Sequence, residues 1–187
     1  MPSITAEKAQ QVLSRSECIY DDATVQSALD GMADKLRVLL ESSNPIVMCL
    51  MTGGLIATSE LMLRLEFPLE LDYIHATRYG NQTAGNELEW KTSPHKEIKG
   101  REILIIDDIL DEGYTLKEII QYCRAEGAKK VYTAVLVEKE HDRRAEGIEA
   151  DVVGLKVPDR YVFGYGMDYK GFLRNVAGIH AAHKDDE

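Results

Sequence analysis

The sequence has few cysteines and no long apolar run, and each of these absences narrows what the protein is. Only three cysteines occur in 187 residues, and no two of them form a Cys-x-x-Cys pair. This pattern favours a reducing compartment, in which a free cysteine behaves as a small hydrophobic side chain. No stretch reaches the ~18 apolar residues of a membrane-spanning helix, and residues 1–20 lack the apolar core of a signal peptide. We therefore expect a cytoplasmic protein that does not bind a membrane.

An excess of positive charge is also missing. The chain has 22 Lys and Arg against 32 Asp and Glu, which gives a formal net charge of −10. Such a chain is not suited to broad electrostatic contact with nucleic acid or an anionic membrane, so an anionic substrate must be held locally, for example through a metal. The remaining composition, 44% hydrophobic and 29% charged, is typical of a soluble globular protein. The length indicates a single domain over residues 1–187.

Strands and helices are predicted to alternate between residues 46 and 137. Apolar runs of strand length stand at 46–51, 69–74, 102–106 and 131–137. Helical patterns follow the first of these runs, over 55–65, and the third, up to Gly127. This alternation predicts an α/β fold with a central, mostly parallel sheet flanked by helices on both faces.

The two ends of the chain lie outside this alternation. Thr5 is predicted to cap a first helix, and apolar residues recur at helical spacing from Val25 to Leu40. Short strands are predicted at 152–157 and 161–165. We expect the N-terminal helices (1–44) and the C-terminal segment (151–187) to contribute a small hood lobe over the sheet, or an interface between subunits.

Two adjacent carboxylates, Asp107 and Asp108, follow the strand predicted at 102–106. In an open parallel sheet, ligands bind beyond the carboxyl ends of the strands. Neighbouring carboxylates repel each other, so a half-buried pair needs partners, and the vicinal hydroxyls of a ribose or a hydrated divalent cation would serve. The alternative is a solvated acidic turn without a ligand.

The residues after this pair form a candidate phosphate site. The segment 111–115 leads into a helix, whose backbone N–H groups and the Thr115 hydroxyl would cradle a phosphate at the positive helix end. Gly113 permits a close approach of the backbone. Because no lysine follows Gly113, this is not the P-loop of a nucleoside triphosphatase. Carboxylates followed by an anion site describe a loop over which a phosphorylated ribose is spread.

The whole segment 103–116, ILIIDDILDEGYTL, resembles the phosphoribosyl pyrophosphate motif of the type I phosphoribosyltransferases. The shared pattern is four apolar residues, two acids, two apolar residues, an acid, a variable residue and glycine, with threonine two positions further on. The resemblance implies that Asp107 and Asp108 hold the ribose and Mg²⁺. It also implies a 5′-phosphate site made of Asp111, Glu112, Gly113, Tyr114 and Thr115. Glu112 departs from the family pattern, which commonly has threonine at this position.

The C-terminal segment 157–169, VPDRYVFGYGMDY, resembles the purine-binding segment of the hypoxanthine-guanine phosphoribosyltransferases. By that resemblance Tyr161 stacks on the purine and Val162 contacts the edge of the base through its backbone. The resemblance also implies that Asp168 helps to hold Mg²⁺ and that Arg174 lies beside the pyrophosphate.

Three further positions fit the same family. Lys139 matches the lysine that reads the oxygen on purine C6. The loop with Thr52 and Gly53 falls where the family binds pyrophosphate, although Thr52 replaces a common lysine. Arg78 and Tyr79 fall in a long loop, predicted at 77–86, that closes over the active site in the family and usually reads Ser-Tyr. The resemblance covers roughly residues 46–174 and leaves the N-terminal helices unexplained.

The reaction implied by the resemblance is displacement of pyrophosphate from Mg²⁺-bound phosphoribosyl pyrophosphate by a purine nitrogen. Asp111 would be the general base or hydrogen-bond partner at the purine imidazole ring. The product would be a nucleoside 5′-monophosphate, and the expected substrates are hypoxanthine and guanine. By resemblance to small acidic enzymes of this kind, the protein is expected to be a homodimer or a homotetramer.

Two other functions stay open at this point. One is a phosphoribosyltransferase that prefers xanthine, because backbone carbonyls read the C2 substituent of the purine. The other is a regulator that senses phosphoribosyl pyrophosphate and binds nucleic acid, which the scattered basic residues do not favour.

Several of these residues also have purely structural interpretations. Without the motif, Tyr161 and Tyr165 would belong to a strand that packs on the core, and Lys139 would be a surface lysine. Trp90 is expected to serve packing. The histidines show no spacing typical of metal ligands, and we assign no catalytic role to any of them, namely His75, His95, His141, His180 and His183.

Overall fold

The computed structural model describes residues 4–78 and 88–187, and its main element is a six-stranded sheet with the order β4-β3-β2-β5-β6-β7. Neighbouring strands are parallel except for β3 and β4, which are antiparallel. This confirms the predicted α/β class and the mostly parallel sheet. The strands are β2 (Ile46–Met51), β3 (Glu70–Arg78), β4 (Leu88–Thr92), β5 (Glu102–Leu110), β6 (Lys130–Glu140) and β7 (Val152–Pro158).

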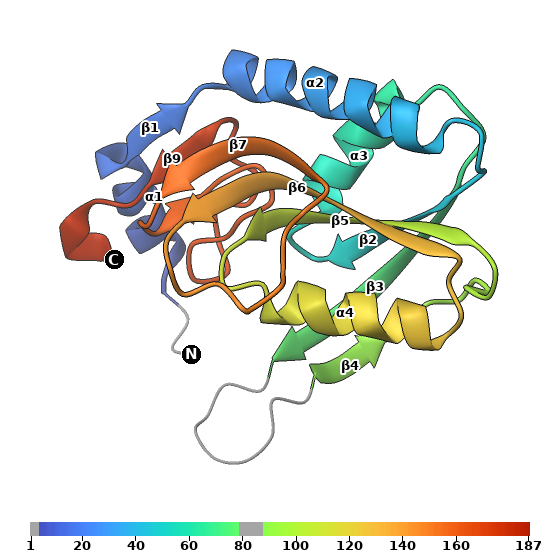
Figure 1. Cartoon of the computed structure of the whole chain (residues 1–187). Coiled ribbons are helices and arrows are strands. Elements are labelled where there is room, and N and C mark those ends of the chain that lie inside the picture. The colour runs from blue at the N-terminus through green and yellow to red at the C-terminus, as the bar shows by residue number, and fades with distance from the viewer. Residues whose placement is uncertain (1–3, 79–87) are drawn as a thin grey trace.

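Helices cover both faces of this sheet, which explains why its central strands are apolar throughout (Figure 1). On one face, α2 (Asp22–Leu40) and α3 (Leu55–Arg64) pack against Val47 and Leu104. On the other face, α4 (Tyr114–Ala125) packs against Met48 and Ile105. Successive strand residues point to opposite faces, so each strand contributes to both cores.

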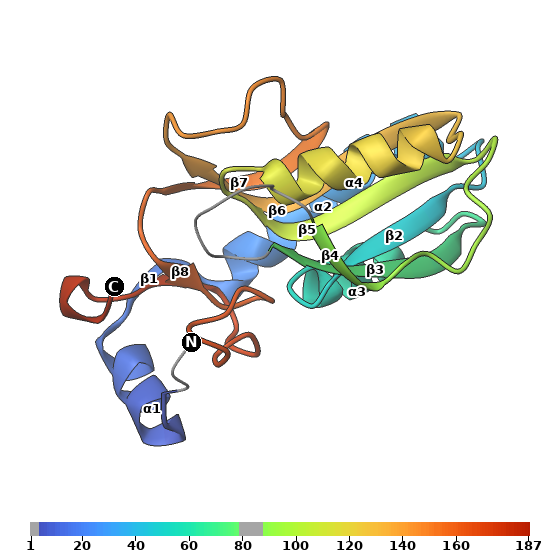
Figure 2. The same cartoon turned by 90° about the horizontal axis from the view of Figure 1, so that it is seen from below.

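A small antiparallel sheet, β1-β9-β8, forms the hood together with the loops that connect its strands. Its strands are β1 (Glu17–Tyr20), β8 (Val162–Phe163) and β9 (Ile179–Ala181), and it is flanked by α1 (Ala6–Arg15) and the 3₁₀ helix η1 (Lys184–Asp186). Figures 1 and 2 show the hood beyond the end of the main sheet toward which β5 and β6 point. Thr5 caps α1 as predicted, because its side chain accepts the backbone N–H of Lys8.

The structure corrects two predicted strands near the site. The strand predicted at 102–106 continues to Leu110, because its ladder with β6 extends through Asp107 and Ile109, paired with Val135 and Val137. The two aspartates therefore lie in a strand rather than in a solvated turn. The strand predicted at 161–165 is only two residues long, since the backbone φ angles of Gly164 and Tyr165 are 98° and 50°, outside the extended region.

The opposite edge of the main sheet also differs from the prediction. The strand predicted at 69–74 continues to Arg78, into the predicted loop, because it pairs with β4, a strand that the sequence patterns did not indicate. The short strands β1 and β9 were not predicted either. Trp90 of β4 packs on Tyr122 of α4, with ring centroids 4.6 Å apart, which confirms its expected packing role. Across residues 4–78 and 88–187, no helix is both long and apolar enough to span a membrane.

Candidate active site

Two adjoining cavities open at the carboxyl ends of the central strands, beneath the hood. The larger, of about 620 Å³, is lined by β5 and the loop after it, the loop after β2, and two hood residues, Asp168 and Arg174. The smaller, of about 290 Å³, is lined by Lys139 at the end of β6 and by the hood around Tyr161. Both cavities share the same four residues, which are Asp108, Ile109, Asp111 and Asp168.

The cavities collect nearly all of the residues that the sequence motifs singled out. The larger is lined by Thr52, Gly53, Asp107, Asp108, Asp111, Glu112, Gly113, Tyr114, Thr115, Asp168 and Arg174. The smaller is lined by Lys139, Tyr161 and Val162 together with the shared residues. Arg78 and the preceding residue of its predicted loop, Thr77, end β3, whereas Tyr79 and residues 80–86 lie outside the described residues.

Asp108 is buried and Asp107 is half-buried at the end of β5. The Oδ1 atom of Asp107 accepts the backbone N–H of Asp108 at 2.9 Å, and Oδ1 of Asp108 accepts that of Ile109 at 2.9 Å. Burial, and then the nearby negative charge of Asp108, raises the pKa of Asp107 well above its ordinary value. Burial also raises the pKa of Asp108. A cation or hydroxyl donors in the larger cavity would favour the ionised form of both carboxylates.

In the loop after β2, the backbone of Gly53 lies close against the carboxylate of Asp108. A Cβ atom added to Gly53 would lie 2.0 Å from Oδ2 of Asp108, and one added to Gly166 would lie 2.2 Å from the carbonyl oxygen of Gly53. The Gly53 backbone is therefore held between the acidic strand end and the hood. Only a residue without a side chain fits in this space.

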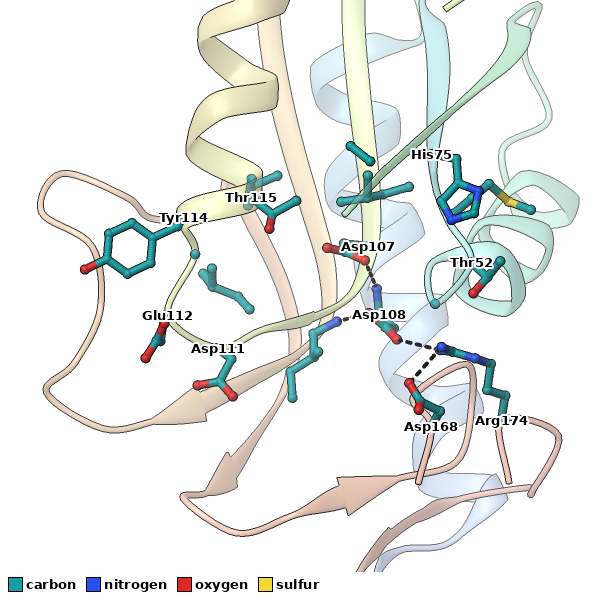
Figure 3. A pocket seen from close by; sticks show the side chains of 18 of the residues that line it. Thr52, His75, Asp107, Asp108, Asp111, Glu112, Tyr114, Thr115, Asp168 and Arg174 are labelled. Carbon is teal, nitrogen blue, oxygen red and sulfur yellow. Dashed lines mark hydrogen bonds and ion pairs between the residues drawn. The ribbon is translucent and has the colours of Figure 1, made fainter. Parts of the chain in front are cut away.

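The hood contributes a cation to the larger cavity. The guanidinium of Arg174 lies between two carboxylates, with Nη2 at 2.7 Å from Oδ1 of Asp168 and Nη1 at 4.0 Å from Oδ2 of Asp108 (Figure 3). Nη1 also donates to the carbonyl oxygen of Gly166 at 2.6 Å. Arg174 therefore offsets part of the negative charge and ties the hood to the acidic strand end.

The first turn of α4 is open toward the larger cavity. Gly113 is the N-cap residue, with φ of 80°, a left-handed conformation that favours glycine. Glycine has no side chain, so no side-chain hydrogen bond caps this end of α4. The N-terminal end of a helix attracts anions. Thr115 and Tyr114 stand at the same turn and line the cavity (Figure 3).

Asp111 lies where the two cavities meet and is held by two partners. Its Oδ2 accepts from Nζ of Lys139 at 2.7 Å, and its Oδ1 is 2.7 Å from Nε2 of His141. Burial opposes ionisation, but these two partners outweigh it and hold the pKa of Asp111 below its ordinary value. The contact with His141 was missed by the sequence analysis. The signal was there, because Lys139 and His141 are two residues apart at a strand end and such residues share one side of a strand.

Tyr161 forms one wall of the smaller cavity. Its ring packs edge-on against Tyr169, with centroids 5.1 Å apart, and its hydroxyl oxygen accepts the backbone N–H of Lys170 at 3.3 Å. The next residue, Val162, pairs with Ala181 in the small sheet. The aromatic wall is therefore held by the hood rather than by the main sheet.

Comparison with known proteins identifies the family. A family model described as phosphoribosyl transferase domain matches residues 16–170. The hypoxanthine-guanine phosphoribosyltransferase of Bacillus subtilis (strain 168) is 31% identical over 162 residues, which cover 86% of this chain and 89% of that protein. The hypoxanthine-guanine-xanthine phosphoribosyltransferase of Tritrichomonas foetus is 27% identical over 161 residues, which cover 86% of this chain and 88% of the relative.

A solved structure shares the whole fold. The hypoxanthine phosphoribosyltransferase of Staphylococcus aureus has a TM-score of 0.87 with this chain at 24% identity, and the match covers 97% of each chain. The matched family domain contains the acidic strand end, the loop after β2, and Lys139 and Tyr161 of the smaller cavity. This chain belongs to the phosphoribosyltransferase family.

Proposed function

We propose that the protein is a purine salvage enzyme, a hypoxanthine-guanine phosphoribosyltransferase. It transfers the 5-phosphoribosyl group from phosphoribosyl pyrophosphate to hypoxanthine, guanine or both, giving the nucleoside monophosphate and pyrophosphate. The observation that carries the proposal is the meeting of the two cavities at Asp111, with the Nζ donor of Lys139 at 2.7 Å from its carboxylate. A base in the smaller cavity and a phosphorylated ribose in the larger one would react across this junction.

The larger cavity divides into three regions that suit phosphoribosyl pyrophosphate. The open turn at Gly113–Thr115 would bind the 5′-phosphate, with Asp111 and Glu112 in the same loop. Asp107 and Asp108 would accept the ribose hydroxyls, and Thr52, Gly53 and Arg174 would contact the pyrophosphate.

Lys139 and Asp111 form a matched pair for a 6-oxopurine. The lysine is a donor for the oxygen on C6, and the carboxylate is an acceptor for an imidazole N–H on the same edge of the base. Tyr161 would stack on the purine, and the backbone of Val162 would contact its C2 edge. An adenine amino group would present a donor to Lys139, so adenine should be rejected.

Asp111 would serve as the general base. Its lowered pKa keeps the carboxylate ionised near neutral pH, as an acceptor must be. The proton on N7 of the imidazole ring moves to Asp111, the lone pair of the other ring nitrogen, N9, forms the bond to ribose C1′, and the bond from C1′ to pyrophosphate breaks with its electron pair. Hydrogen bonds from Thr52 and the charge of Arg174 would stabilise the departing pyrophosphate.

The acidic residues fit a magnesium ion that arrives with its substrate. No group of three or more His, Cys, Asp or Glu within 4–78 and 88–187 is placed to hold a metal by protein ligands alone. Mg²⁺ usually takes one or two carboxylates and completes its shell with water and substrate phosphates, and the adjacent carboxylates of Asp107 and Asp108 offer that. Asp168, at the opposite wall of the cavity, would help to hold the ion. When bound, the ion would neutralise charge on the pyrophosphate.

A preference for xanthine is the second candidate among bases, because the relative from Tritrichomonas foetus is named for xanthine as well. The nucleic-acid-binding regulator is not favoured, since the chain carries a net charge of −10. A cytoplasmic location and a homodimer or homotetramer are further proposals. The exposed apolar side chain of Leu63, with 79% of its surface accessible, and that of Leu71 offer surface for assembly.

The deciding experiment is a spectrophotometric assay with phosphoribosyl pyrophosphate and each of hypoxanthine, guanine, xanthine and adenine. We expect turnover of 6-oxopurines, none of adenine, and loss of activity in EDTA that Mg²⁺ restores. Absence of turnover with all three 6-oxopurines in the presence of Mg²⁺ would contradict the proposal. Light scattering on a sizing column tests the oligomer.

A further inference from the structure

His141 is buried next to the proposed general base. Only 2% of its side chain is exposed, against 41% for Asp111, and the ring approaches Oδ1 of that carboxylate. Lys139 holds the other oxygen, Oδ2. Each oxygen of the carboxylate therefore has its own partner, one from a flexible lysine and one from a buried ring.

The hydrogen bonds of the ring determine where its proton lies. The backbone N–H of Arg143 points at Nδ1 of His141, with 3.0 Å between the nitrogens. A backbone amide can only donate, so Nδ1 must be the acceptor and Nε2 must carry a proton. His141 is therefore a donor to Asp111, with its tautomer and ring orientation both set by the next turn of the chain.

The segment that carries His141 is anchored on both sides of the junction between the cavities. The guanidinium of Arg143 makes two hydrogen bonds, of 2.6 and 2.9 Å, with the carboxylate of Asp159 in the hood. The backbone N–H of Ala145 donates to the carbonyl oxygen of Glu112 at 2.8 Å. The segment thus links the wall that holds Tyr161 to the loop that holds Asp111, and it keeps His141 in place.

We propose that His141 is a positioning residue for Asp111. When a purine binds, Lys139 exchanges Oδ2 of Asp111 for the oxygen on C6, and Oδ2 becomes free to accept from the imidazole ring of the base. Oδ1 stays bound to His141, so the carboxylate keeps its orientation while its other partner leaves. This rests on the proposed function, because it assumes that a 6-oxopurine occupies the smaller cavity.

The test compares three substitutions at this position. His141→Leu removes the donor, and His141→Gln places an amide N–H near the position of Nε2. His141→Asn keeps an amide that is one bond too short to reach Asp111. We expect kcat to fall roughly 10- to 100-fold in His141→Leu and His141→Asn, because a hydrogen bond to a charged group is lost. The KM for phosphoribosyl pyrophosphate should stay within about twofold, since its proposed contacts lie elsewhere, and His141→Gln should recover most of the kcat.

The matched control is His95→Leu. His95 is also a histidine beside an aspartate, with Nδ1 at 3.5 Å from Asp72, but it lines neither cavity. The His95→Leu variant should keep the kcat and KM of the wild type. Folding of each variant is checked by circular dichroism, and if His141→Leu does not fold, the pair His141→Gln and His141→Asn decides.

Two results would overturn the role of His141 while the wild-type enzyme is active. One is a folded His141→Leu, or His141→Asn, with wild-type kcat, and the other is a folded His141→Gln that loses as much kcat as His141→Asn. An inactive wild-type enzyme would instead contradict the proposed function. In that case the NMR spectrum of ¹⁵N-labelled histidine still decides the contact, since a proton on Nδ1 of His141 rather than on Nε2 would overturn it.

Discussion

Replacing Gly53 by alanine should damage both stability and activity, because no space exists for the added methyl group. The new Cβ would lie 2.0 Å from Oδ2 and 2.5 Å from Cγ of Asp108. Ordinary van der Waals contact begins near 3.4 Å, so the carboxylate or the loop must move by more than 1 Å. Neither moves freely, since Asp108 accepts from Ile109 and the Gly53 carbonyl is packed against Gly166.

The size of the effect follows from this geometry. Overpacking in a rigid environment costs about 1–3 kcal/mol of folding free energy. The clash with the carboxylate of Asp108, which is held by its hydrogen bond from Ile109, places Gly53→Ala at about 2–3 kcal/mol. For a chain of this length, that lowers Tm by roughly 4–12 °C. Displacing Asp108 from its position should reduce kcat/KM for phosphoribosyl pyrophosphate by about tenfold to a hundredfold.

Urea denaturation and steady-state kinetics on the same preparations measure both effects. The control is Gly31→Ala in the middle of α2, where none of the described atoms lies within 4 Å of the added Cβ. An alanine there should stabilise the helix by about 0.5–1 kcal/mol and leave activity unchanged. If Gly53→Ala were as stable and as active as the wild type, the close packing of this loop on Asp108 would be wrong.

Three further predictions concern the charged groups. Asp111→Asn should lower kcat about a hundredfold or more with little change in Tm, and near-normal turnover would remove its role as base. Lys139→Met should lower kcat/KM for hypoxanthine by roughly 10²–10³-fold, because the oxygen on C6 loses its donor; an unchanged value in the base assay would contradict its role. Asp107→Asn should increase stability by about 1–2 kcal/mol at pH 7 in EDTA while abolishing activity. The pKa of Asp107 is raised in the fold, so its favourable contribution is full below the ordinary value of 3.8 and is lost as pH rises toward the raised pKa. In urea denaturation, the free energy of unfolding of Asp107→Asn should therefore exceed that of the wild type by an amount that grows from pH 4 upward. A difference that shrank as the pH rose would refute the raised pKa of Asp107.

The sequence was a good guide to the main sheet because the strands at its centre are buried on both faces. Such strands appear as continuous apolar runs, as at 46–51 and 103–106, and their alternation with helices leaves few topologies. The edge strand β4 and the hood strands are short and carry mixed residues, so their pairing depends on distant partners that local patterns do not reveal.

The motifs also predicted most of the residues that line the cavities, since those residues stand in contiguous segments. The order of the strands in the sheet decided which residues of different segments come into contact. Asp111 and Lys139 are 28 positions apart, and only the adjacency of β5 and β6 places them in contact.

By itself, the sequence determined the α/β class, the open helix end at Gly113 and the acidic strand end at Asp107 and Asp108, because each depends on residues close together in the chain. The tertiary structure decided that Gly53 is held between Asp108 and Gly166, and that His141 donates to Asp111. These contacts join segments from different elements, and their geometry depends on how the sheet and the hood pack against each other.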